Sequence, residues 1–168
     1  LDHGARLAGR VSGDSTVAFA LAFARAAEAA TGTEPPPRAH WLRALMAELE
    51  RLANHVGDFG FICNDAAYAL IHTHCGILRE EILQACDDLF GRRLLMDKIV
   101  PGGVAVDLPE GGAARLRGLV AEIGTRLPVI VAAYDETPSL LDRTVATGVV
   151  TVVVGSLPFL GLIVPNLV

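Results

Sequence analysis

The chain has 168 residues, with 14 Lys and Arg against 19 Asp and Glu, and therefore a net charge of −5 at pH 7. That length suits one domain with a sizeable core, and a hydrophobic fraction of 52% argues against intrinsic disorder. Because phosphate binding needs concentrated positive charge, the net acidity without a Lys/Arg cluster excludes a nucleic-acid-binding protein.

The first expected helix begins at Asp14 or Ser15, either of which can serve as its N-cap, and ends at Thr31 before Gly32. The second begins at Pro37, which fits the first turn of a helix because its missing N–H has no partner there. Its apolar residues repeat every three or four positions and form one stripe: Leu42, Leu45, Leu49, Leu52, Val56 and Phe59.

Charged residues of this second helix lie off the stripe, namely Arg43, Glu50 and Arg51. Together with Glu48 they are expected to form ion pairs on the helix surface, each worth a few tenths of a kcal/mol, about 0.2–0.5.

A third helix is expected from Ala66 to Phe90, closed by Gly91, and should pack antiparallel to the second. Around Pro101-Gly102-Gly103 a short strand or hairpin is expected, and a fourth helix follows Pro109. Pro128 should kink this fourth helix without ending it, because the apolar periodicity continues beyond it. The predicted fold is mainly α, an antiparallel helical bundle of about four helices with a short strand or hairpin between the third and fourth.

The C-terminal segment carries no charge from Thr144 to Val168. Its length raises the question of a membrane span, but Pro158 and Pro165 break it into short pieces. We expect a helical domain over residues 1–148, followed by an apolar tail of uncertain origin over 149–168, formed of buried strands or foreign to the natural protein.

Three cysteines, Cys63, Cys75 and Cys86, fit neither a CxxC metal site nor a secreted disulfide framework, so a reducing compartment is expected. The chain begins at Leu1 without a signal peptide, and we expect it to be a fragment of a longer protein.

A metal site at His72-Thr73-His74-Cys75 is disfavoured, because residues i and i+2 of a helix point about 200° apart. His72 and Cys75 alone would supply only two ligands. The neighbouring carboxylates of Glu80-Glu81 and Asp87-Asp88 diverge by about 100° and cannot share a proton. We assign no metal ligand and no catalytic residue in this chain.

Four separated blocks of the sequence together resemble a known family: Arg10 to Ser15, PPPRAHWLRALMAELERLANH followed by Asn64-Asp65, PGGVAVDLP, and LLDRTVATGVV. Over residues 8–150 the chain is similar to the large-subunit family shared by energy-converting [NiFe] hydrogenases of the formate hydrogenlyase subunit 5 type and the 49-kDa subunit of respiratory complex I, the NADH-quinone oxidoreductase.

The resemblance also exposes departures from the family pattern. In the hydrogenase branch the first block carries two cysteines that hold nickel and iron, and Ser12 and Ser15 stand at those positions. A hydroxyl is a poor nickel ligand, so hydrogen chemistry is not expected. In the complex I branch an aspartate and a quinone-binding tyrosine fall on Ser12 and Gly13, and a histidine near the terminal iron–sulfur cluster falls on Leu95.

The candidate cofactor-binding residues implied by the resemblance are Arg10, Ser12, Ser15 and Asp65. Of these, Arg10, Ser15 and Asp65 match positions that line the quinone cavity in the family, whereas Ser12 stands where the family has a cysteine or an aspartate. Plainer interpretations stay open. Arg10 can be an ordinary surface residue, Ser15 only the N-cap of the first predicted helix, and Asp65 only the N-cap of the third.

The implied function is that of a fragment of the large subunit of a membrane-associated oxidoreductase complex. The fragment would pack against an iron–sulfur small subunit holding a [4Fe-4S] cluster, with quinone as a further cofactor and membrane subunits as further partners, peripheral on the cytoplasmic side of the inner membrane. The fragment holds no cofactor itself, is expected to be inactive alone, and should self-associate through exposed apolar surface. The alternative is a helical interaction or scaffold module without a redox role.

Overall fold

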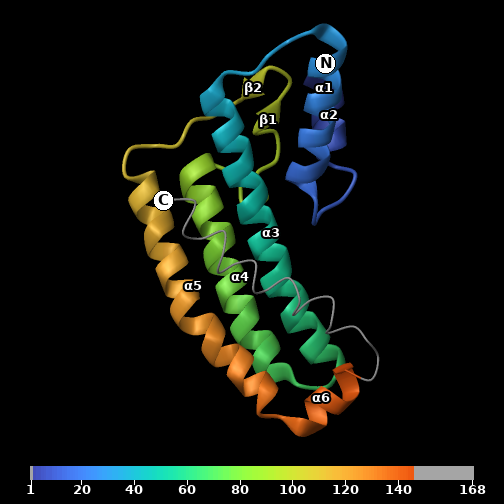
Figure 1. Ribbon diagram of the computed structural model, residues 1–168, viewed down its shortest axis with the longest axis vertical. Helices are drawn as coiled ribbons and strands as arrows, with labels where there is room; N and C mark the ends of the chain where they lie inside the picture. The colour runs from blue at the N-terminus through green and yellow to red at the C-terminus, as the bar shows by residue number, and fades with distance from the viewer. Residues whose placement is uncertain (1, 146–168) are drawn as a thin grey trace. The chain divides into compact units, whose positions relative to one another are not determined.

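The computed structural model describes residues 2–145 and is shown in Figure 1. In chain order the elements are α1 (Asp2–Ala8), α2 (Thr16–Thr31), α3 (Pro37–Asp65), α4 (Ala69–Phe90), β1 (Ile99–Val100), β2 (Gly103–Val104), α5 (Gly112–Asp135) and α6 (Pro138–Val145). The mainly α prediction, with a short hairpin between the third and fourth predicted helices, is confirmed.

The predicted number of about four helices is too low for the described residues, which form six. The two that were missed, α1 and α6, have 7 and 8 residues, too few to show a 3.6-residue repeat. The four predicted helices are present as α2, α3, α4 and α5, and α5 continues through Pro128 as expected. Helix α2 ends as predicted, with Gly32 in the left-handed conformation at φ +68°.

The described residues form two compact units, the first made of residues 2–51 and 83–112 and the second of residues 52–82 and 113–145. In the first unit α1 and α2 pack on each other and on β1. The antiparallel hairpin pairs Ile99 with Val104 and Val100 with Gly103, and its turn contains Gly102 at φ +86°. That left-handed backbone is the reason a glycine is needed there.

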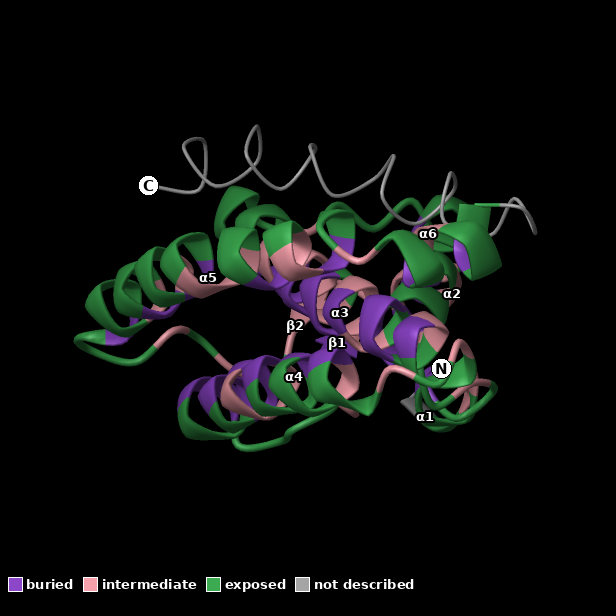
Figure 2. Cartoon of the chain, turned by 90° about the horizontal axis from the view of Figure 1, so that it is seen from below, coloured by how far each residue is buried: buried purple, intermediate pink, exposed green. Residues whose placement is uncertain are grey.

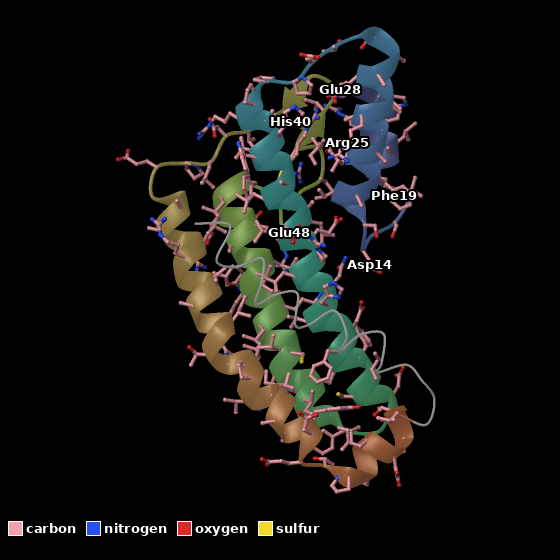
Figure 3. The ribbon with its side chains drawn as sticks, in the orientation of Figure 1. Asp14, Phe19, Arg25, Glu28, His40 and Glu48 are labelled. Carbon is pink, nitrogen blue, oxygen red and sulfur yellow. The ribbon has the colours of Figure 1, made fainter. Side chains whose placement is uncertain are left out.

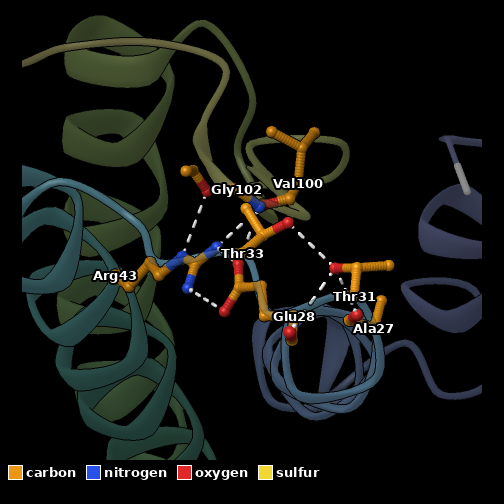
Figure 4. A network of polar contacts seen from close by, with 8 residues as sticks. Ala27, Glu28, Thr31, Thr33, Arg43, Val100 and Gly102 are labelled. Carbon is orange, nitrogen blue, oxygen red and sulfur yellow. Dashed lines mark hydrogen bonds and ion pairs between the residues drawn. The ribbon is translucent and has the colours of Figure 1, made fainter.

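A buried ion pair ties this hairpin to two helices of the first unit (Figure 4). The Arg43 guanidinium on α3 donates to the Glu28 carboxylate on α2 at 2.5 and 3.1 Å, and both side chains are less than a tenth exposed. Arg43 also donates to the carbonyl oxygens of Val100 and Gly103, while the Gly102 N–H donates to Glu28. The prediction that Arg43 forms a surface ion pair is therefore wrong, because Glu28 lies opposite it; the surface pair between Glu48 and Arg51 is confirmed.

In the second unit α3 and α4 run antiparallel, as predicted. Gly57 of α3 faces Arg79 of α4, whereas Gly60, one turn later, faces His72 and Cys75. A Cβ on Gly60 would lie only 2.7 Å from the Cys75 Cβ, so the glycine sets how closely the two helices approach.

Helices α5 and α6 complete this second unit. Arg126 of α5 forms an ion pair with Glu81 of α4, and the ring of Tyr134 packs edge-on against Phe59 of α3. The Tyr134 hydroxyl also lies 2.6 Å from the Thr144 hydroxyl, which joins α6 to α5. Figure 2 shows the buried positions of the described helices as stripes along single faces, in keeping with the apolar periodicity of the sequence.

Among the helices of residues 2–145, none combines the length and the apolarity that a membrane crossing requires. The apolar tail predicted over 149–168 lies outside the described residues, and so does its predicted boundary at residue 148.

Candidate functional site

Three of the four predicted site residues lie on one short connection in the first unit. We call residues 10–15, which join α1 to α2, the site segment. It carries Arg10, Ser12 and Ser15, and both serines are half-buried. The fourth predicted residue, Asp65, belongs to the second unit.

Arg10 is fixed by an ion pair with a residue far away in the sequence. Its two terminal nitrogens donate to the two carboxylate oxygens of Asp97 at 2.7 and 2.9 Å, and one of them also donates to the Arg6 carbonyl oxygen at 2.7 Å. The hydrogen bonds from Arg10 lower the pKa of Asp97 below its ordinary value, so the carboxylate stays ionised at neutral pH. Arg10 is therefore not an unconstrained surface residue; it connects the site segment to the loop before β1.

The loop that Arg10 holds has an unusual backbone. Leu95 and Asp97 adopt φ values of +55° and +64°, although neither is a glycine, and the Leu95 side chain is buried. Each left-handed residue of this kind costs roughly 1–2 kcal/mol. The Arg10–Asp97 pair helps to hold this conformation at the position where the resemblance implies a histidine.

Ser15 occupies the N-cap position of α2, as predicted, but its side chain makes no capping hydrogen bond. The cap comes instead from Glu50 of α3, whose carboxylate accepts the N–H groups of Val17 at 2.6 Å and Ala18 at 3.0 Å. The prediction of a surface ion pair for Glu50 is therefore wrong, because the N-terminus of another helix lies opposite this side chain. The Ser15 hydroxyl makes no capping hydrogen bond that would compete with ligand binding.

Figure 3 shows Asp14 at the N-terminal end of α2 and Phe19 one turn further along. Large apolar side chains are exposed within and near the site segment: Leu7, Val11 and Phe19 are 56%, 67% and 42% exposed. Large apolar side chains left exposed to water are often covered by a binding partner.

Asp65 is the last residue of α3 and is exposed. It cannot be the N-cap of the next helix, because α4 begins only at Ala69. The turn between α3 and α4 is stabilised by backbone groups. Ala67 adopts the left-handed conformation, and the Tyr68 N–H donates to the Cys63 carbonyl oxygen. The interpretation of Asp65 as a helix cap is therefore wrong.

We expect Asp65→Asn to change the free energy of unfolding by no more than about 0.5 kcal/mol, because an exposed residue without a capping role contributes little to stability. Thermal unfolding monitored by circular dichroism measures this. A loss near the 1 kcal/mol typical of a removed cap would contradict the structure.

All three cysteines are free and buried. Burial raises the pKa of the Cys63 thiol to about 11, and those of Cys75 and Cys86 to about 12. Since a thiol binds a soft metal as its thiolate, protonated and buried thiols are poor ligands at neutral pH. Within residues 2–145 no group of three or more His, Cys, Asp or Glu residues is arranged to hold a metal ion.

A thiol titration tests this burial directly. At about pH 8 the folded chain should react only slowly with an aromatic disulfide reagent, whereas the chain unfolded in guanidinium should react at all three cysteines. If one thiol of the folded chain reacted as fast as the thiols of the unfolded chain, that result would contradict its burial in the structure.

Comparison with known proteins identifies the family of this chain. Residues 69–155 match the family model of the respiratory-chain NADH dehydrogenase, 49 Kd subunit. The chain belongs to this family. The resemblance drawn from the four sequence blocks is confirmed.

Among its relatives, NADH-quinone oxidoreductase subunit 4 of Thermus thermophilus is 32% identical over 77% of this chain and 32% of its own length. Hydrogenase-4 component G of Escherichia coli is 28% identical over 85% of this chain and 26% of its own length, and formate hydrogenlyase subunit 5 of the same species is 28% identical over 84% and 25%. The chain therefore spans about a third or less of the length of these curated relatives.

The site segment of this 49 Kd subunit family member offers hydroxyl, guanidinium and carboxylate groups, and no thiol. The hydroxyl and guanidinium groups can donate hydrogen bonds to a carbonyl oxygen, and the carboxylate can accept one from a hydroxyl group. None of these groups is the soft sulfur ligand that a nickel–iron pair prefers. The structure adds Asp97 and Glu50, which sequence reasoning missed. Their partners are 87 and 33 positions away, beyond any local pattern.

Proposed function

We propose that the chain is part of the large subunit of a membrane-associated oxidoreductase complex, NADH-quinone oxidoreductase or formate hydrogenlyase-like, that packs against an iron–sulfur small subunit. Its role there is electron transfer toward quinone, without the hydrogen-activating centre of the hydrogenases. Its place is peripheral, on the cytoplasmic side of the inner membrane.

The observation that carries the proposal is the exposure of three large apolar side chains, Leu7, Val11 and Phe19, which stand before, within and after the site segment in the sequence. In a family whose curated relatives include NADH-quinone oxidoreductase and formate hydrogenlyase subunits, such side chains suit contact with a partner subunit. Because these side chains are only 42–67% exposed, covering them would contribute about half of the roughly 1.5–3 kcal/mol that full burial of each side chain gives.

The donor set supports a role in binding quinone. The Ser12 and Ser15 hydroxyls are half-buried, and the Ser15 hydroxyl makes no capping bond to α2. A hydroxyl donates readily to a quinone carbonyl oxygen. Arg10 would position the site segment rather than bind the quinone headgroup, because both terminal nitrogens of its guanidinium donate to Asp97.

Co-purification tests the proposal. The chain, tagged within its full-length natural subunit, should isolate from membranes together with a protein that contains a [4Fe-4S] cluster, recognised by its electron paramagnetic resonance signal and by equal amounts of iron and labile sulfide. Val11→Asp should reduce this association more than tenfold, because it places a charge in an apolar interface.

The matched control is Val129→Asp, which introduces the same charge at an exposed valine of α5 in the second unit. It should leave the association unchanged. A subunit that isolates without any iron–sulfur protein, as a self-sufficient monomer, would favour the alternative of a helical scaffold module.

A further inference from the structure

The first turn of α2 is capped by a side chain from another helix. The Glu50 carboxylate of α3 accepts the Val17 N–H at 2.6 Å on one oxygen and the Ala18 N–H at 3.0 Å on the other. Counted from the N-cap residue Ser15, Val17 and Ala18 are the second and third residues of the helix. An N-cap serine normally accepts a hydrogen bond from one of these two N–H groups with its own hydroxyl oxygen. Glu50 and Ser15 are therefore alternative acceptors for the same donors.

The backbone of Ser15 agrees with a cap supplied by Glu50. Its φ and ψ angles are −128° and 37°, whereas a residue that caps its own helix typically lies in the β region, where ψ exceeds about 100°. In this conformation the Ser15 side chain makes no capping hydrogen bond, and the residue is half-buried. A cap from Ser15 would require rotation about ψ. Because the two N–H groups already donate to Glu50, that rotation would gain no hydrogen bond.

A serine cap would by itself satisfy the start of the helix. Glu50 brings a carboxylate partly out of water and fixes a longer side chain, which costs solvation and conformational entropy. In return, its two hydrogen bonds join α3 to the start of α2 across 33 positions of the chain. The end of the site segment is thereby held against a second helix and not only by its own.

We propose that Glu50 is a positioning residue for the site segment, which caps α2 in place of Ser15 and leaves the Ser15 hydroxyl to donate to a ligand carbonyl oxygen. A capping bond would hold that hydroxyl against the helix end, whereas the uncapped hydroxyl can turn toward a ligand. Glu50 acts through Ser15 and needs no contact with the ligand. The inference rests on the proposed function in taking Ser15 as a contact of the quinone.

Thermal unfolding of this chain, followed by circular dichroism, tests whether the two caps are alternatives. Ser15→Ala in the wild-type background should shift the unfolding midpoint by less than about 1 °C, because no cap is lost. In the Glu50→Ala background, where Ser15 takes over the cap, the same change should lower the midpoint by about 2–4 °C, the equivalent of one N-cap. Equal effects of Ser15→Ala in the two backgrounds would overturn the proposal.

The carbon-13 shifts of Ser15 give a second readout, which a purely stabilising role of Glu50 would not move. In the wild type the Cα and Cβ shifts should match the non-capping conformation, and in Glu50→Ala they should move toward those of an extended N-cap residue. Glu48→Ala is the matched control, because this carboxylate of the same helix pairs with Arg51 and should leave the shifts unchanged. N-cap shifts in the wild type, or unchanged shifts in Glu50→Ala, would refute the release of Ser15.

Steady-state kinetics of the full-length subunit in its complex, with a short-chain quinone, test the link to the ligand. Ser15→Ala should raise KM roughly 2- to 10-fold through the loss of one hydrogen bond, with a smaller change in kcat. Glu50→Ala should raise KM by a similar factor and the double variant no further, because both changes remove the same contact. Glu48→Ala should leave KM unchanged.

The kinetic outcomes separate this inference from the proposed function. Independent effects of the two changes on KM, or an unchanged KM in Glu50→Ala, would refute the positioning role while the complex still reduces quinone. A complex that reduces no quinone would refute the proposed function. The two measurements on the chain alone would then still support or refute the exchange of caps between Glu50 and Ser15.

Discussion

Arg43→Met is expected to lower the free energy of unfolding by about 3–5 kcal/mol, the usual result of breaking a buried ion pair by removing one partner. Among the described residues, the buried Glu28 carboxylate would keep only the Gly102 N–H as a donor, and the carbonyl oxygens of Val100 and Gly103 would lose the hydrogen bonds from Arg43. Urea unfolding followed by circular dichroism measures the change, with comparison of the slopes to confirm that both chains unfold alike.

The matched control for this prediction is Arg38→Met on the same helix. Arg38 also makes bidentate hydrogen bonds to a carboxylate, that of Asp107, but both side chains are more than half exposed. Water and salt screen such a pair, so this change should have little effect. Equal losses in the two variants would contradict the burial of Arg43. Replacing both Glu28 and Arg43 with Met should recover part of the loss, because no buried charge is then left alone.

The same pair predicts a pH dependence of stability. The hydrogen bonds from Arg43 lower the pKa of Glu28 in the folded chain. A lowered carboxyl pKa stabilises the fold at pH values above the unfolded-state pKa of about 4.3, and this contribution disappears as pH falls through the folded-state value. The stability difference between wild type and Arg43→Met should therefore shrink below about pH 4.

Gly60→Ala is expected to lower the free energy of unfolding by about 1–2 kcal/mol, although alanine is intrinsically the better helix former by roughly 1 kcal/mol. The new Cβ would lie 2.7 Å from the Cys75 Cβ and 3.4 Å from the His72 Cα, atoms that can move only if α3 and α4 separate. The penalty for overpacking therefore exceeds the gain in helix propensity. The midpoint of thermal unfolding should fall accordingly.

Gly57→Ala, one turn earlier in α3, is the control. Its Cβ would lie 3.0 Å from Arg79 Cδ and 3.1 Å from Arg79 Nε, but this flexible side chain can rotate away. We expect stability to stay constant or to rise by up to about 1 kcal/mol. A loss as large as that of Gly60→Ala would show that both glycines, and not the Gly60–Cys75 contact alone, set the approach of the two helices.

The sequence predicted the helices where a local signal was present. The apolar stripe from Leu42 to Phe59 gave the long helix α3, and Gly32 and Gly91 gave the ends of α2 and α4. The prediction failed where a helix was too short to show a periodic pattern, or where a helix end was set by backbone conformation rather than by residue type. Helices α1 and α6 offer about two turns each, and the end of α3 depends on Ala67 in the left-handed conformation rather than on a glycine.

For the candidate site, the sequence selected the segment but not the contacts that position it. Arg10, Ser12 and Ser15 were found through a resemblance spread over four blocks, whereas Asp97 and Glu50 carry no local sign of their roles. A charged residue off the apolar stripe of a helix is predicted to lie on the solvent-exposed surface. This prediction is right for Glu48 and Arg51 but wrong for Arg43 and Glu50.

The sequence by itself determined the helical class, the principal helices and the family, because these depend on the spacing of apolar residues and on short motifs. Only the tertiary structure decided which charges are buried and what they hold. Periodicity reports the direction in which a side chain projects from its own helix, but not what lies opposite it. The carboxylate opposite Arg43, the helix N-terminus opposite Glu50 and the loop opposite Arg10 are all brought there by packing of distant parts of the chain.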